Sequence, residues 1–244
     1  HTRLASVSWA GDVYKRQAVA TMMTCSFSAC SDNDDPTPDT GTSETDAKFE
    51  AIAKQYLDHT VYVTYKNLAD ETEQLVKDLQ ALKSSKTDAN VKATCETFLE
   101  ARAWWEKSEA FLYGAATDFG IDPHIDSWPL DLDGLQTALK NTEQVEAMGG
   151  EDGDIYAGEK LGNSLLGFHG IEYILFEDGS PKSVSKISDL HLTYAVAVAG
   201  DLRNRCWQLE LSWRGESAVN ADRVAKVANE LELPYTVNLS LIHI

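Results

Sequence analysis

The chain has 244 residues, 43% of them hydrophobic and 25% charged, which is the composition of a globular protein with one sizeable core or two small ones. Its formal net charge of −18 and isoelectric point near 4.6 argue against nucleic-acid binding, because phosphate contacts need a face rich in Lys and Arg. Cations are the more natural partners, although an acidic balance most often serves solubility alone.

The two ends of the sequence do not fit the pattern of the rest. Residues 1–17 have no initiating Met, and the last residues break off without a helix stop signal. Both resemble translated sequencing-adapter read-through, so 1–17 and 234–244 are predicted to be non-native. We therefore expect a natural protein that is longer at both ends.

Residues 18–29 form a short, uncharged stretch behind two basic residues, which is the layout of a secretory signal peptide. The sequence at 27–30, Phe-Ser-Ala-Cys, resembles a bacterial lipobox, whose cysteine is lipidated and becomes the new N-terminus. It predicts a lipid anchor on Cys30, although Phe27 stands where Leu is usual. Cys25 is a poorer candidate, and an ordinary disordered N-terminus with a chance cysteine is the alternative.

Residues 30–46 contain Pro, Thr, Ser, Gly and acidic residues but no large apolar side chain, so they predict a solvated tether. The acidic run after Cys30 is similar to the export signal of some surface lipoproteins. A segment that spans a bilayer needs a run of about 18 apolar residues, and the sequence has no such run. The lipid anchor is therefore the only expected membrane contact. We expect a cell-envelope protein on the outer membrane, either periplasmic or surface-exposed.

From Asp46 onward the apolar residues recur with helical period, and no segment alternates with period two. Two connections interrupt the pattern, one rich in Pro at 121–135 and one rich in Gly and acid at 149–154. The predicted fold is all-α, an up-and-down helical bundle over 47–233 with a long crossover. The expected helices are 49–82 as one helix or two, 88–116, about 131–148, 156–177, 188–214 and about 217–232.

Charged residues occupy apolar positions in two of these helices. Arg102 and Glu109 fall on the seam of 88–116, where an internal ion pair, or pairing across the bundle, would explain them. Two cysteines, Cys95 and Cys206, also fall on apolar stripes. They predict buried free thiols, with a disulfide as the alternative in an exported protein.

The stretch GFHGIEYILF at 167–176 places His169 and Glu172 three residues apart on one helical face, where they could bind one cation together. An unpartnered carboxylate at a seam position costs several kcal/mol, so Glu172 is expected to be protonated, paired or metal-bound. A core histidine with an internal hydrogen bond is the alternative for His169. Three nearby glycines indicate a close approach of another group to the backbone, or plain helix packing. They are Gly162, Gly167 and Gly170.

Three ordered sequence blocks resemble the imelysin family: WWEKSEAFLYG at 104–114, IDSWPLD at 125–131, and GFHGIE at 167–172, which fits that family's Gly-x-His-x-x-Glu signature. The resemblance covers roughly 47–233. It implies an exported, often lipid-anchored bacterial protein of all-α fold, built as two related bundles with the motif facing a cleft between them. Since family members usually continue further, we expect this chain to stop before the second bundle is complete.

The resemblance also implies which residues form the site. His169 and Glu172 are the motif's metal-competent pair, Glu109 is the further metal ligand, and the residues expected to line the ligand cleft are Gly167, Trp128 and Pro129. Imidazole with carboxylate suits iron, zinc or manganese alike.

Three functions follow from these observations. The family includes the peptidase for which it is named, iron-regulated proteins and a domain of ferrous-iron uptake proteins, so the first expectation is a lipoprotein of iron uptake. It would bind a metal ion or an iron-containing ligand and contact other proteins of the uptake system. A metallopeptidase is the second, but peptidase chemistry needs three protein ligands and a base, and only two ligands lie in the motif. A structural or adhesive helical lipoprotein is the third.

Overall fold

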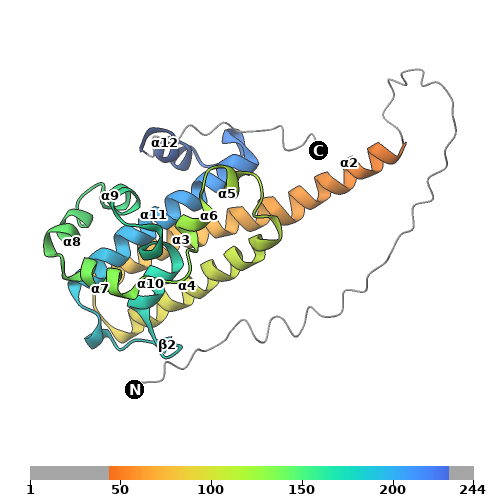
Figure 1. Cartoon of the computed structure of the whole chain (residues 1–244). Coiled ribbons are helices and arrows are strands. Elements are labelled where there is room, and N and C mark those ends of the chain that lie inside the picture. The colour runs from red at the N-terminus through yellow and green to blue at the C-terminus, as the bar shows by residue number, and fades with distance from the viewer. Residues whose placement is uncertain (1–43, 231–244) are drawn as a thin grey trace. The chain divides into compact units, whose positions relative to one another are not determined.

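The computed structural model describes residues 44–230, with side chains to residue 228. The chain divides after Phe49 into two units. Of the first, the structure describes residues 44–49, which begin helix α2 (Glu44–Tyr56). The end of the predicted tether is therefore helical. Cys30, the predicted signal peptide and both predicted non-native ends lie outside the described residues. The second unit is all-α, as predicted (Figure 1).

Three long helices form the centre of the second unit. Helix α2 continues through a π-helical turn, Leu57–Val61, into α3 (Tyr62–Ser84), and a short loop leads to α4 (Asp88–Ser108). Helix α3 packs against both α4 and α11 (Asp189–Arg214). Tyr65, early in α3, stacks on Trp213, late in α11, so these two helices run antiparallel. The up-and-down arrangement expected from the sequence is confirmed (Figure 1).

Local capping residues set the helix starts. The side chain of Thr87 accepts a hydrogen bond from the backbone N–H of Asn90 at the start of α4. Ser188 and His191 form a reciprocal capping box at the start of α11. Polar residues just before α4 and α11 thus cap the first turn of each helix.

The connection between α4 and α11 consists of short elements. After the 3-10 turn Glu109–Phe111 come α5 (Ala115–Asp118), α6 (Asp122–Ile125), α7 (Leu132–Lys140), α8 (Thr142–Met148), α9 (Gly153–Lys160), the 3-10 turn Asn163–Leu165 and α10 (Gly167–Leu175). A small antiparallel hairpin, β1 (Phe176–Glu177) with β2 (Ser180–Pro181), and the 3-10 turn Val184–Lys186 precede α11. The 3-10 turn Glu216–Ala218 then leads to α12 (Ala221–Glu230).

Several expected boundaries were wrong. The helix predicted at 156–177 is two helices, α9 and α10, because the backbone is extended at Leu161, Gly162 and Leu166, and Gly167 then adopts a positive φ of 65° at the start of α10. The helix predicted at 131–148 breaks at Asn141, whose side chain caps α8. Helix α4 ends at Ser108, where it gives way to the 3-10 turn Glu109–Phe111, and the positive φ of Gly114 follows that turn. The 121–135 connection contains α6. The hairpin was missed because two-residue strands are too short to show alternation.

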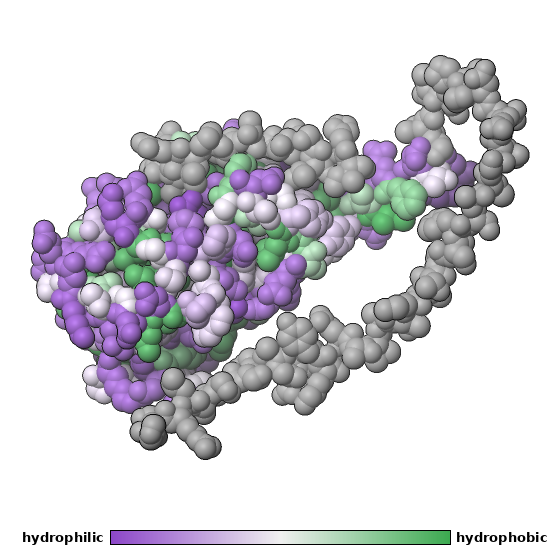
Figure 2. Space-filling view, viewed as in Figure 1, coloured by the Kyte–Doolittle hydropathy of each residue, from purple (hydrophilic) through white to green (hydrophobic). Residues whose placement is uncertain are grey.

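The core is built from large aromatic and aliphatic side chains. Trp105, Tyr65, Tyr194, Phe111 and Phe168 are among its largest fully buried members. Cys95 and Cys206 are buried free thiols, which confirms that prediction. Hydrophilic residues predominate on the face of the second unit seen in Figure 2. Within 44–230, no helix has the length and apolar character needed to cross a membrane.

Candidate functional site

The candidate site lies where α4, the end of α6 and α10 meet. Helix α10 contacts both α4 and α6. Helix α4 contributes Arg102 and Trp105, and the residue after α6, Asp126, lies between them and His169 of α10. Three segments that are separate in the sequence therefore share one polar cluster.

Gly167 makes this meeting of helices possible. Its φ of 65° begins α10, and a Cβ there would overlap the backbone carbonyl oxygens of Ile125 and His124 at the end of α6. A Cβ on Gly170 would come 2.6 Å from the carbonyl oxygen of Leu165. The close backbone approach expected from the glycines is present at these two positions, whereas nothing lies within 4 Å of a Cβ on Gly162.

His169 is held between two carboxylates. Its Nε2 lies 3.0 Å from Oδ1 of Asp126, and its Nδ1 lies 3.1 Å from Oε2 of Glu172. Burial lowers the pKa of His169, but the hydrogen bonds to Asp126 and Glu172 outweigh it and raise the pKa to about 9. At neutral pH the ring is therefore an imidazolium that donates from both nitrogens. The indole of Trp128 packs on the ring, with centroids 4.8 Å apart.

Asp126 is the residue that every other member of the cluster shares. Its Oδ1 accepts hydrogen bonds from His169 and from Nη1 of Arg102, and its Oδ2 accepts from Nε1 of Trp105 at 2.9 Å. Burial raises the pKa of Asp126, but these donors outweigh it and hold the pKa well below its usual range. Asp126 is thus a carboxylate that stays ionised at neutral pH although only 15% of its side chain is exposed.

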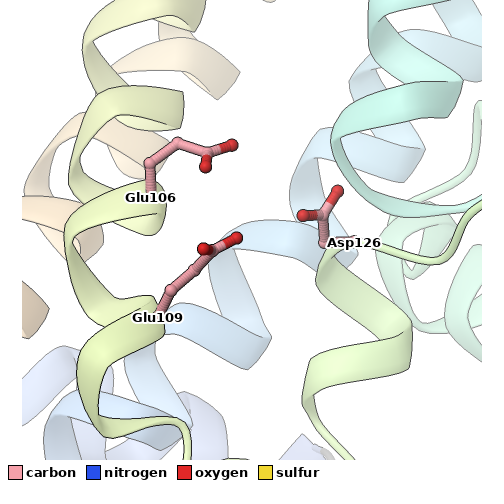
Figure 3. A group of neighbouring side chains, drawn as sticks. All are labelled: Glu106, Glu109 and Asp126. Carbon is pink, nitrogen blue, oxygen red and sulfur yellow. The ribbon is translucent and has the colours of Figure 1, made fainter. Parts of the chain in front are cut away.

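On its other side Asp126 faces two more carboxylates. Figure 3 shows Glu106 and Glu109, both from the C-terminal end of α4 and the turn that follows, pointing toward Asp126. One oxygen from each of the three residues lies within 4.8 Å of the others. Burial, followed by the charges of Glu106 and Asp126, raises the pKa of Glu109. Glu106 is partly neutralised by Nη2 of Arg102 at 2.6 Å.

This donor set fits an oxygen-seeking cation better than the predicted ligand set does. Both nitrogens of His169 already face carboxylates, so a metal would have to displace a proton to reach either one. An ionised carboxylate has about four lone-pair directions, and Asp126 uses three of them. Oxygen atoms on Asp126, Glu106 and Glu109 therefore remain able to bind a hard cation.

The structure brings His169 and Glu172 together, but Glu172 is 53% exposed and does not lie in the helix seam. The predicted seam treated 156–177 as one helix, whereas the chain breaks before α10. Glu109 does not group with the His169–Glu172 pair. Among the described residues, its metal-competent neighbours are Glu106 and Asp126.

The remaining predicted residues have mixed surroundings. Trp128 packs on His169, although 74% of Trp128 is exposed, and Pro129 follows it, also exposed, through a cis peptide bond. Arg102 does not pair with Glu109. It pairs with Glu106 on its own helix and, across the bundle, with Asp126, and pairing across the bundle was the other alternative that the sequence left open.

Sequence reasoning missed Asp126, Trp105 and Glu106 as members of the site. All three lie inside the blocks 104–114 and 125–131 that carried the family resemblance. The signal was therefore present, but spacing along the sequence could not show that the end of α6 docks against α4 and α10.

The fold and this site define a class of protein when they are compared with known ones. A sequence model of the imelysin family matches residues 61–237, which is well over half of the chain. The chain belongs to the imelysin family. It is 31% identical over 163 residues to iron-regulated protein A of Synechococcus elongatus, an alignment that covers 66% of this chain and 40% of that protein.

Two solved structures share the fold. A structure described as an iron-regulated protein A precursor from Parabacteroides distasonis matches with a TM-score of 0.62 and 26% identity, over 81% of this chain and 54% of that one. An imelysin-like protein from Psychrobacter arcticum matches with a TM-score of 0.56 and 15% identity, over 75% of this chain and 54% of that one. The chain thus spans about half the length of these solved chains, and less of the curated relative.

Proposed function

We propose that this protein is an iron-related binding protein of the cell envelope, which holds a metal ion, or the metal of an iron-containing ligand, at the cluster centred on Asp126. Oxygens of Asp126, Glu106 and Glu109 would be the ligands. His169 and Arg102 would hold Asp126 in place, and Glu172 would hold His169. A direct ligand role for His169 and Glu172, which the sequence favours, remains a prediction that the same experiments test.

One observation carries the proposal: three carboxylates converge within 4.8 Å while the cations beside them, Arg102 and His169, are already engaged. Like charges at this distance repel one another, and after burial, which is the larger cause, the charges of Glu106 and Asp126 help to raise the pKa of Glu109. A bound cation would relieve this repulsion. Carboxylate oxygens suit hard cations, and the name of the relative from Synechococcus elongatus supports iron.

The proposed location rests on the sequence. The lipobox-like stretch ending at Cys30 supports an envelope lipoprotein attached through a lipid anchor, and the family membership supports other proteins of an iron-uptake system as partners.

Calorimetric titration with Mn²⁺, and with Fe²⁺ in the absence of oxygen, tests the binding site. We expect Glu109→Gln to weaken binding at least about 10-fold. The same change should leave the unfolding free energy unchanged or higher, because it removes the repulsion with Glu106 and Asp126. This opposite response of affinity and stability is not expected of a residue that only supports the fold.

Glu96→Gln is the matched control, since Glu96 is an exposed glutamate of α4 that pairs with Lys92. It should leave affinity unchanged. Glu172→Gln and His169→Ala measure the ligand roles predicted from the sequence, together with the metal content of protein purified without chelator. Equal affinity in the parent and in Glu109→Gln would remove Glu109 from the site, and no binding by the parent would end the proposal.

A further inference from the structure

Trp105 contacts the site from the side of the core. Only 1% of the residue is exposed. The one polar atom of its side chain, Nε1, donates a hydrogen bond to Oδ2 of Asp126 at 2.9 Å. A buried indole N–H usually finds a hydrogen-bond partner, and this one is a charged carboxylate, which makes the bond stronger than a neutral one.

The three hydrogen bonds to Asp126 are unequally divided between its oxygens. Arg102 and His169 both donate to Oδ1, which accounts for the two lone pairs of that atom. Trp105 uses one lone pair of Oδ2, so the remaining accepting capacity of the carboxylate is also on Oδ2. The oxygen that Trp105 holds is therefore the oxygen that Asp126 can offer to a cation.

The indole is also the most rigid of the three donors. Arg102 is shared with Glu106, and His169 is shared with Glu172. Trp105 sits in a packed core, where side chains occupy fixed rotamers, and its N–H has Asp126 as its hydrogen-bond partner. Rotation of the Asp126 carboxylate about its χ2 angle would break this bond.

We infer that Trp105 is a positioning residue of the binding site: its indole N–H fixes the carboxylate plane of Asp126 so that Oδ2 presents one lone pair to the bound cation. This inference rests on the proposed function. It goes beyond that function by assigning the orientation of the central ligand to a core tryptophan that does not itself touch the ligand.

Trp105→Phe keeps an aromatic ring in the core but removes the N–H donor. We expect it to bind Mn²⁺ about 10- to 100-fold more weakly than the parent, the usual loss when a partner of a metal ligand is removed. Trp104→Phe is the control. Trp104 is the preceding residue and is only partly buried, and its ring lies against Lys107, away from these hydrogen bonds, so its replacement should leave affinity unchanged.

A second measurement uses the parent protein and does not depend on how the variant folds. The chain has six tryptophans, whose indole N–H groups give separate signals in a ¹⁵N NMR spectrum. We expect titration with diamagnetic Mg²⁺ or Zn²⁺ to shift the Trp105 signal and to saturate at the same concentrations as a calorimetric titration with the same ion. Asp126→Asn should shift this signal without any metal, because the charged acceptor becomes a neutral amide.

The outcomes separate the inference from the proposed function. If the parent binds metal and Trp105→Phe binds it equally well, the positioning role is overturned while the binding function stands. An unmoved Trp105 signal in Asp126→Asn overturns the positioning role as well. If the parent binds no metal, the proposed function fails and the positioning role fails with it.

Discussion

At the scale of single residues, Asp126 determines the electrostatics of the site. It accepts from two cations and an indole, and this arrangement explains why its pKa is held low while that of His169 is raised. The pairing of His169 with Glu172 could be predicted from the sequence, because residues three apart on a helix always share a face. The partnership with Asp126 could not, because it depends on how α6 docks.

The raised pKa of His169 predicts a loss of stability in alkaline solution. The folded pKa is about 9 and the unfolded value about 6.5, so the stabilisation is fully present below pH 6.5 and is lost as pH rises through 9. The shift corresponds to roughly 3 kcal/mol at most. Urea unfolding of the parent between pH 6 and pH 10 should show this decrease.

The control for that experiment is His169→Gln, which fills similar space but does not titrate. Its unfolding free energy should fall less over the same pH range than that of the parent. Parallel curves for the two proteins would show that the His169 imidazolium does not contribute to stability.

At the scale of elements, the site depends on the break between α9 and α10. The sequence pattern predicted one helix there, because Leu161 and Leu165 happen to continue the helical spacing of Phe168 and Leu175. The local signal for the break was the pair Gly162 and Gly167. Only Gly167 has a positive φ, the backbone conformation that favours glycine. Periodicity identifies which residues are buried, but the extended backbone at Leu161, Gly162 and Leu166, together with the positive φ of Gly167, separates the two helices.

Gly167→Ala should therefore disturb the docking of α10 on α6. An added Cβ would overlap the Ile125 carbonyl oxygen, and alanine is strained at a φ of 65°. We expect thermal and urea unfolding to show a loss of at least about 2 kcal/mol. Metal affinity should fall too, since His169 would move relative to Asp126.

Gly162→Ala is the matched control, because nothing lies within 4 Å of its added Cβ and its φ is negative. Its stability should stay within about 0.5 kcal/mol of the parent. If both variants were equally stable, close packing at Gly167 would not be what positions α10.

At the scale of the whole molecule, the all-α bundle could be predicted because the same period recurs in every long segment. The long helices α3, α4 and α11 were expected to within a few residues, apart from the early end of α4. The short elements of the crossover could not, since each is decided by caps, glycines and tertiary contacts and not by a repeating pattern. The net charge of −18 is compatible with cation binding but does not specify a site.

Attachment to a membrane is a property of the whole chain and is predicted from residues 27–30. A precursor expressed in a bacterium and labelled with a fatty-acid probe should carry the label, and Cys30→Ser should lose it. Loss of label only in Cys25→Ser would move the anchor to Cys25. Equal labelling of parent and both variants would rule out a lipid anchor at either cysteine.

The two buried thiols have a consequence for how the chain reaches its native state. Burial raises the pKa of Cys95 to about 12, and that of Cys206 is raised further, so neither forms the thiolate that attacks a disulfide once the bundle has formed. Before that moment both are reactive. Folding and oxidation therefore compete in time, and in oxidising surroundings a slowly folding chain would be trapped by wrong disulfides that a rapidly folding chain never forms.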